Sequence, residues 1–132
     1  MAQEGMAQEG TAQGFMLSPH VAVRAIPGKG NGVVATAPIA AGDMVEVSPI
    51  LICPAGSIPD SGHALSDHVY GYGDEVAVGL GYASLYNHSR NPNCTWDFNE
   101  TLPAILIWAT RAIGPGEELT LDYGIPLWFR EA

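Results

Sequence analysis

The sequence predicts a small all-β domain with short helical turns, and three observations lead to this fold class. First, 16 glycines and 10 prolines are spread along 132 residues and separate short runs that are rich in β-branched side chains. Second, no window has the apolar period of a long amphipathic helix. Third, hydrophobic residues make up 47% of the chain, which suffices for one packed core at this length.

Four strands are expected in the first half of the chain, each an apolar run between glycines and prolines. They cover residues 21–26, 32–36, 43–47 and 50–53. Pro27-Gly28 ends the first run, and Ser48-Pro49 separates the third from the fourth. The turn before the third strand has a fixed geometry, because Pro38 presets φ and Gly42 permits a positive φ.

A polar loop and five further strands are expected in the second half. The loop covers residues 54–68 and the strands 69–72, 75–80, 95–98, 104–109 and 118–123. A glycine–aspartate pair is a turn signal between the first two strands, and residues 99–103 connect the next two as a hairpin. The last strand alternates Leu119 and Leu121 with polar neighbours, which is typical of a half-buried strand. One short helical turn is expected at residues 83–86.

The sequence also carries an internal echo. Residues 34–43 follow the pattern Val-Ala-Thr-x-Pro-Ile-x-x-Gly-Asp, and residues 108–117 follow it loosely as Trp-Ala-Thr-Arg-Ala-Ile-Gly-Pro-Gly-Glu. Each copy is expected to form a strand, a tight turn and a second strand. The sequence therefore predicts two similar hairpin units packed around one core.

The chain is strongly acidic. Five basic and fourteen acidic residues give a net charge of −9, and Lys29 is the single lysine. Such a surface repels nucleic-acid phosphates, so direct nucleic-acid binding is not expected. It attracts basic partners, including peptide tails rich in lysine and arginine. One alternative stays open, namely that the acidity only keeps a small protein in solution.

The few cysteines and the lack of targeting patterns indicate the cellular compartment. Cys53 and Cys94 are too few for a disulfide scaffold or a four-cysteine zinc site. No stretch approaches the roughly 20 apolar residues of a membrane helix, and the first residues lack the basic-then-apolar pattern of a secretory signal. We expect an intracellular protein without membrane association, cytoplasmic in a bacterium and otherwise nuclear or host-nuclear. Residues 1–14, with a duplicated Met-Ala-Gln-Glu-Gly, are expected to be a flexible tail before a single domain at 15–132.

Three polar motifs carry the functional signal. They read Lys-Gly-Asn-Gly-Val-Val-Ala at 29–35, Asn-His-Ser-Arg-Asn-Pro-Asn-Cys at 87–94 and Gly-Glu-Glu-Leu-Thr-Leu-Asp-Tyr-Gly at 116–124. In order and spacing the chain resembles SET-domain protein-lysine methyltransferases from Val21 to Trp128. The resemblance implies a β-clip fold, with the Asn-His-Ser loop and the C-terminal segment in a knot-like arrangement. It also implies methyl transfer from S-adenosyl-L-methionine to the ε-amine of a lysine in a basic protein or histone-like tail, leaving S-adenosyl-L-homocysteine.

The same resemblance implies a cofactor site. Its residues would be Lys29, Gly30, Asn31, Gly32, Asn87, His88 and Trp128. Glycines let the backbone approach a ligand closely, although the glycine pair taken alone also fits an ordinary hairpin turn. Asn87 would hold the amino group of the cofactor, and the main chain at His88 would hold the adenine. For this loop the alternative is an Asx turn with a histidine packed in the core. The family often has an arginine where this chain has Ser84.

The resemblance also assigns aromatic residues to the reaction. Tyr123 corresponds to the catalytic tyrosine of the family, and Tyr70 is the expected second tyrosine of the site. Tyr72 and Trp96 are expected to line the lysine channel, where aromatic faces favour a cation. The alternative for each is plain core packing. Trp108, inside an apolar strand, is expected in the core, and Asp122 is expected to be a structural hydrogen-bond acceptor.

No cysteine follows Cys94, so neither zinc nor a zinc-bound segment after the domain is expected. The chain in this respect resembles the minimal SET proteins of viruses and bacteria. Such proteins complete their small cores by pairing, so a homodimer is expected, with residues 105–108 as its candidate surface or else as core. Two alternatives to an enzyme stay open. One is a non-enzymatic β-clip module of the SAF type, and the other is a degenerate SET protein that binds cofactor without turnover.

Overall fold

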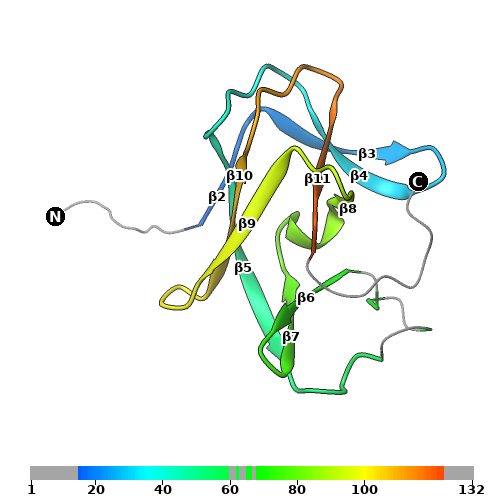
Figure 1. Cartoon of the computed structure of the whole chain (residues 1–132), viewed down its shortest axis with the longest axis vertical. Coiled ribbons are helices and arrows are strands. Elements are labelled where there is room, and N and C mark those ends of the chain that lie inside the picture. The colour runs from blue at the N-terminus through cyan, green and yellow to red at the C-terminus, as the bar shows by residue number, and fades with distance from the viewer. Residues whose placement is uncertain (1–14, 60–61, 63–64, 67, 124–132) are drawn as a thin grey trace, which may run out of the picture.

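The computed structural model describes residues 15–59, 62, 65–66 and 68–123, which form two β-sheets and one short helix (Figure 1). The six-stranded sheet has the order β6 (Val69–Tyr72), β7 (Glu75–Gly79), β5 (Met44–Cys53), β10 (Ala104–Ala109) and β9 (Cys94–Asn99), with β2 (Met16–Leu17) also paired to β5. The four-stranded sheet has the order β3 (Val21–Ile26), β4 (Gly30–Ala35), β11 (Glu118–Leu121) and β8 (Asn87–His88). The 3₁₀ helix η1 (Ala83–Leu85) precedes β8. The predicted all-β class with one helical turn is confirmed.

The hairpin of β3 and β4 carries the first polar motif. Gly28 and Gly30 in its turn both have φ of +78°, a left-handed conformation that glycine adopts at no steric cost. The main-chain N–H of Lys29 donates to the carbonyl of Ile26 at 2.9 Å and closes the turn. The predicted strand pair is confirmed, with β4 beginning at Gly30 rather than at Gly32.

Strand β11 brings the three polar motifs into one sheet. It is antiparallel to β4 on one side and parallel to β8 on the other, with Thr120 opposite Asn87. Leu119 and Leu121 are fully buried, whereas Glu118 and Thr120 are half-buried on the other face. The predicted alternation in this strand is therefore correct, and it leaves a row of polar side chains beside the Asn-His-Ser loop.

The internal echo marks the junction of the two sheets. Residues 34–43 run from β4 through a turn into β5, and residues 108–117 run from β10 through a turn into β11. The two turns lie side by side (Figure 1), and Ile39 and Ile113 exchange reciprocal main-chain hydrogen bonds of 2.9 Å. Both isoleucines are buried. The two units therefore exist and their turns pair with each other, but the prediction that each is a hairpin is wrong, because β4 and β11 lie in the four-stranded sheet and β5 and β10 in the six-stranded sheet.

One core joins both sheets and η1. Its largest fully buried side chains are aromatic or branched aliphatic, and they include Val33, Val45, Tyr70, Tyr86, Ile105, Ile107, Ile113, Leu119 and Leu121. Full burial of one such aliphatic side chain contributes on the order of 1.5–3 kcal/mol. Because Tyr70 and Tyr86 are part of this core, packing holds their ring positions firmly.

The predicted break at Ser48-Pro49 is wrong, because β5 is continuous across it. At Pro49 the neighbour of β5 changes from β10 to β7, so the missing N–H of proline falls at the end of one ladder. The carbonyl of Pro49 accepts a hydrogen bond from the N–H of Leu80 at 2.9 Å. The short strands β2 and β8 were not predicted, since two residues carry no periodicity.

The prediction that Trp108 belongs to the core is also wrong. Side chains of a strand alternate between faces, and in β10 Ile105 and Ile107 take the core face. Trp108 and Leu106 consequently lie on the other face and are half-buried. Since Ile105 and Ile107 are core, the surface predicted for a dimer is not available on that face. The dimer itself stays a prediction.

Two predictions concern residues outside the described ranges. The N-terminal tail at residues 1–14 and the proposed contact of Trp128 lie outside them. Among the residues that are described, no helix has the length and apolarity needed to cross a membrane.

Candidate active site

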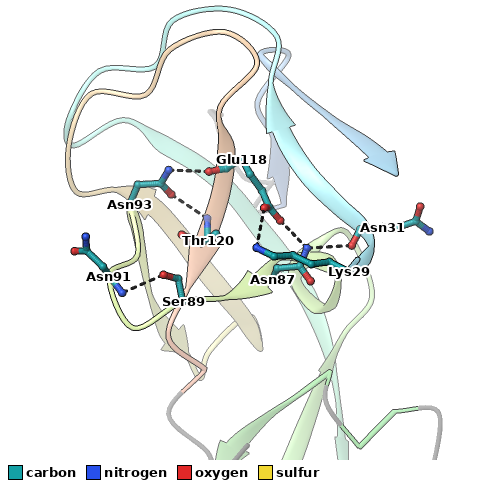
Figure 2. Close-up of polar contacts among 8 residues, drawn as sticks. All are labelled: Lys29, Asn31, Asn87, Ser89, Asn91, Asn93, Glu118 and Thr120. Carbon is teal, nitrogen blue, oxygen red and sulfur yellow. Dashed lines mark hydrogen bonds and ion pairs between the residues drawn. The ribbon is translucent and has the colours of Figure 1, made fainter. Parts of the chain in front are cut away.

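The three polar motifs meet around the side chain of Glu118 (Figure 2). One carboxylate oxygen accepts a hydrogen bond from Nδ2 of Asn87 at 2.6 Å, and the other pairs with Nζ of Lys29 at 3.3 Å. Nδ2 of Asn87 also donates to the main-chain carbonyl of Asn31 at 3.3 Å. Lys29, Asn31 and Asn87, which the sequence predicts in one site, therefore do lie together, with Glu118 at the centre.

Sequence reasoning assigned no role to Glu118. A signal for it existed, because Glu118 and Thr120 occupy the polar positions of an alternating strand. Its partners, however, come from the β3–β4 turn and from β8, which are distant in the sequence. The local pattern shows which face Glu118 occupies, and only the pairing of strands shows what it meets.

Gly32 lies where the backbone comes closest to this cluster. A Cβ atom at this position would be 2.6 Å from Cγ1 of Ile26, 2.7 Å from Oε2 of Glu118 and 2.8 Å from Nδ2 of Asn87. Any side chain here would displace the amide and the carboxylate. Gly30 differs, since a Cβ there would meet nothing within 4 Å, and its positive φ is what requires glycine. Glycine is thus required at position 32 for lack of space and at position 30 for the backbone conformation.

The cluster offers the groups that a zwitterionic amino-acid head requires. Lys29 supplies a cation for a carboxylate, and Glu118 supplies an anion for an ammonium group. The amide oxygen of Asn87 accepts no hydrogen bond from any residue in the described part of the chain, whereas its nitrogen donates twice. An ammonium group has three donors and fits this free acceptor.

The loop that carries Asn87 is fastened to β11 by Asn93, which is 2% exposed. Its Nδ2 donates to the carbonyl of Glu118 at 2.8 Å, and its Oδ1 accepts from the N–H of Thr120 at 2.9 Å (Figure 2). Asn91, by contrast, is exposed, and its main-chain N–H donates to Oγ of Ser89 at 3.0 Å. The side chain of Asn87 binds residues distant in sequence, which argues against the alternative of a simple Asx turn.

We expect Asn93→Ala to lower the free energy of unfolding by about 2–4 kcal/mol. The change leaves a buried N–H on Thr120 and a carbonyl on Glu118 without their side-chain partner. Urea denaturation checks this, with the exposed Asn91→Ala in the same loop as the matched control. Equal unfolding midpoints for the two variants would show that Asn93 does not hold the loop.

The two tyrosines predicted to be catalytic lie against each other. The rings of Tyr70 and Tyr123 stack with centroids 4.5 Å apart and an interplanar angle of 9°. The hydroxyl of Tyr123 donates to the carbonyl of Tyr86 at 2.5 Å, and that of Tyr70 donates to the carbonyl of Ala83 at 2.5 Å. Burial raises the pKa of both phenols above that of a free tyrosine. Both therefore remain protonated near neutral pH and act as oriented hydroxyl groups.

A row of aromatic rings continues from this pair. The rings of Trp96 and Tyr70 meet edge-on with their centroids 4.8 Å apart. In the same way the centroids of Phe98 and Trp96 are 5.1 Å apart, and those of Tyr72 and Phe98 are 4.7 Å apart. The indole N–H of Trp96 donates to the main-chain carbonyl of Asp122 at 2.6 Å, so the backbone of Asp122 is one structural acceptor at this point. Trp96 thus adjoins the tyrosine pair, whereas Tyr72 reaches it through Phe98, a residue that sequence reasoning did not select.

The far end of this row opens into a hollow of about 510 Å³. Two rings and three carboxylates line it, together with two glycines: Gly71, Tyr72, Gly73, Asp74, Glu75, Phe98 and Glu100. Aromatic faces and carboxylates both favour cations, so the electrostatic character of this hollow suits a basic side chain.

His88 connects the loop to the segment that bears Tyr123. Its Nδ1 accepts a hydrogen bond from the N–H of Tyr123 at 3.4 Å and lies 3.8 Å from the carboxylate of Asp122. Cys94 is buried, and burial raises the pKa of its thiol to about 12, so it remains a neutral packing residue at physiological pH. Within the described ranges, no three His, Cys, Asp or Glu side chains form a metal-binding group.

Sequence comparison gives the family. The SET-domain family model matches residues 30–124. The chain is 33% identical over 106 residues to the histone-lysine N-methyltransferase, H3 lysine-37 specific, of Schizosaccharomyces pombe, covering 78% of this chain and 72% of that protein. A 50-residue stretch is 52% identical to the histone-lysine N-methyltransferase SMYD3 of Homo sapiens, but spans only 11% of it.

Solved structures agree on the fold. The crystal structure of Plasmodium falciparum PFL0690c, described as a candidate histone methyltransferase, superposes with a TM-score of 0.68 at 24% identity over 86% of this chain and 100% of that one. KRYPTONITE, solved with DNA, an H3(1-15) peptide and S-adenosyl-L-homocysteine, gives 0.64 at 23% identity over 84% of this chain and 24% of that one. These identities establish the fold alone. Together with the sequence match, they show that the chain belongs to the SET-domain family of protein-lysine N-methyltransferases.

Proposed function

We propose that the protein transfers a methyl group from S-adenosyl-L-methionine to the ε-amine of a lysine in a basic protein, with a histone-like tail as the substrate class. The observation that carries this is the adjacency of two groups. Asn87, whose amide oxygen has no donor among the described residues, directly follows Tyr86, whose carbonyl holds the hydroxyl of Tyr123. A site for an amino-acid head group and an oriented phenol are thus one residue apart.

The residues present fit the cofactor. Lys29 would hold its carboxylate, Asn87 and Glu118 would hold its ammonium group, and Gly32 leaves the space that this approach needs. Main-chain groups at Asn31 and His88 complete the proposed set. When bound, the cofactor supplies the methyl group on a sulfonium centre.

Tyr123 and Tyr70 would receive the lysine amine. Methyl transfer depends on in-line approach more than on strong acid or base chemistry, so a rigid phenol is a suitable orienting group. Tyr123 is buried and stacked, and its hydroxyl direction is fixed by a main-chain acceptor. Trp96 at the edge of Tyr70 would form part of the wall along the lysine stem, with Tyr72 and Phe98 farther out.

A basic substrate agrees with the charge of the chain. The net charge is −9, and Asp74, Glu75 and Glu100 border the hollow at the end of the aromatic row. The net negative charge and these three carboxylates would both attract a cationic segment of a substrate. The H3 specificity in the name of the Schizosaccharomyces pombe relative points to the same class of basic substrate.

The direct test is transfer of a tritiated methyl group to core histones and to ribosomal proteins, beside calorimetric titration with S-adenosyl-L-methionine. Binding with transfer supports the proposal. Binding without transfer indicates a degenerate SET protein, and absence of binding indicates a non-enzymatic β-clip module.

We also propose that the protein acts as a homodimer. Apolar side chains gather around β2, where Phe15, Met16, Leu17 and Met44 are between 37% and 53% exposed. Covering such a group would add apolar contacts to a small core. Light scattering at micromolar concentration is expected to give twice the monomer mass. A fully active monomer would contradict this.

A further inference from the structure

A carboxylate lies buried in the middle of the six-stranded sheet. Glu46 of β5 has β10 and β2 as neighbouring strands and is 2% exposed. Its Oε1 accepts a hydrogen bond from the hydroxyl of Tyr86 at 2.8 Å, and its Oε2 accepts one from the main-chain N–H of Tyr82 at 2.8 Å. The reaction proposed above makes no use of this group.

The two donors stand at the two ends of η1. Tyr82 is the residue before the helix, and Tyr86 is the residue after it. One carboxylate therefore holds both ends of the 82–86 segment. Charge-assisted hydrogen bonds of this kind are shorter and about twice as strong as neutral ones.

The same segment supplies the acceptors for both site tyrosines. The carbonyl of Ala83 receives the hydroxyl of Tyr70, and the carbonyl of Tyr86 receives the hydroxyl of Tyr123. The second contact of Tyr123, at 3.4 Å, is again to the carbonyl of Ala83. A shift of this segment would consequently turn both phenols.

Gly81 leaves space for the carboxylate of Glu46, and burial of this carboxylate costs desolvation energy. A Cβ at position 81 would lie 2.4 Å from Oε2 of Glu46 and 3.1 Å from Oγ of Ser48, so Gly81 provides the room. Burial raises the pKa of Glu46, while the hydrogen bonds from Tyr86, Tyr82 and Ser48 act in the opposite direction. An apolar side chain would avoid the desolvation of a buried charge but would leave the two donors without an acceptor.

We propose that Glu46 is a positioning residue for the reaction. It fixes the 82–86 segment, and through the carbonyls of Ala83 and Tyr86 it sets the direction of the Tyr70 and Tyr123 hydroxyls. Glu46 itself touches neither substrate nor cofactor. The inference rests on the proposed function in one respect, namely that Tyr123 orients the lysine amine.

The test replaces Glu46 with glutamine, which keeps the size and removes the charge. Glu46→Gln is expected to lower kcat about tenfold and to leave the Kd for S-adenosyl-L-methionine within about twofold, since Asn87 is held in place by its own hydrogen bonds to Glu118 and Asn31. The control is Asp97→Asn, the same chemical change at an exposed position of β9, which should leave kcat unchanged.

A double-mutant cycle separates positioning from general destabilisation. If Glu46 acts through the phenol, Tyr123→Phe should cost about tenfold less in kcat in the Glu46→Gln background than in the wild type. Independent, additive effects on kcat would overturn the proposal. Tyr86→Phe, which removes one donor to Glu46 but keeps the carbonyl, should lower kcat in the same direction and serves if Glu46→Gln does not fold.

A readout without turnover keeps the two proposals distinct. In protein labelled with ¹³C-tyrosine, Glu46→Gln should shift the ring signals of Tyr70 and Tyr123, and Asp97→Asn should not. If the wild type transfers no methyl group, the proposed function fails, and these signals still decide the role of Glu46. Unchanged Tyr70 and Tyr123 signals in Glu46→Gln would overturn it whatever the activity.

Discussion

Replacing Tyr123 with phenylalanine is expected to lower kcat by about 100-fold or more and to leave the Kd for S-adenosyl-L-methionine nearly unchanged. Lys29 and Asn87 of the head-group cluster bond to Glu118, whereas the hydroxyl of Tyr123 is fixed by the carbonyl of Tyr86. The hydroxyl of Tyr123 should therefore stabilise the transition state rather than the bound cofactor. Loss of one such positioned contact costs on the order of 10²-fold in rate.

The measurement is kcat on the best peptide beside the cofactor Kd. Tyr82→Phe is the matched control, because the hydroxyls of Tyr70 and Tyr123 donate to the carbonyls of Ala83 and Tyr86 and not to the phenol of Tyr82. Tyr123→Phe also leaves a buried carbonyl without its donor, so a loss of stability of about 1–2 kcal/mol should accompany it. If kcat falls less than about threefold while Kd rises in step, Tyr123 is a binding or packing residue.

Asn87→Ala is expected to weaken binding of S-adenosyl-L-methionine by about 1–3 kcal/mol, which is roughly 5- to 150-fold in Kd. The change removes the amide oxygen that is proposed to accept the ammonium group. It also removes the 2.6 Å hydrogen bond that orients the carboxylate of Glu118. Two groups of the head-group site are thereby disturbed at once.

Calorimetric titration checks this second prediction, with Asn91→Ala as the control in the same loop. The exposed side chain of Asn91 points away from the cluster (Figure 2), so its removal should leave Kd unchanged. Equal affinity in wild type and Asn87→Ala would remove Asn87 from the site and would place the ammonium group elsewhere.

Local patterns in the sequence determined much of the fold. Alternation placed Leu119 and Leu121 in the core, and glycine turns bounded the β3–β4 and β6–β7 hairpins. The echo between residues 34–43 and 108–117 predicted two related units. Each of these features depends on neighbours within a few residues, so the sequence alone is sufficient to predict them.

The sequence also supplied the candidate site, through three motifs and the family that they resemble. Lys29, Asn31, Gly32 and Asn87 do meet, and Tyr70 does lie against Tyr123. What each residue does there remains a proposal. The motifs fix which residue types are present, and their order along the chain agrees with one family.

Only the tertiary structure decided the contacts between distant strands. The parallel pairing of β8 with β11 places Glu118 between Lys29 and Asn87, and β5 carries Glu46 beneath η1. Only the structure showed which face of β10 is the core face, which leaves Trp108 on the other, and that β5 continues through Pro49. The physical reason is that a strand's periodicity shows which side chains share a face, whereas its partners are set by packing across the whole core.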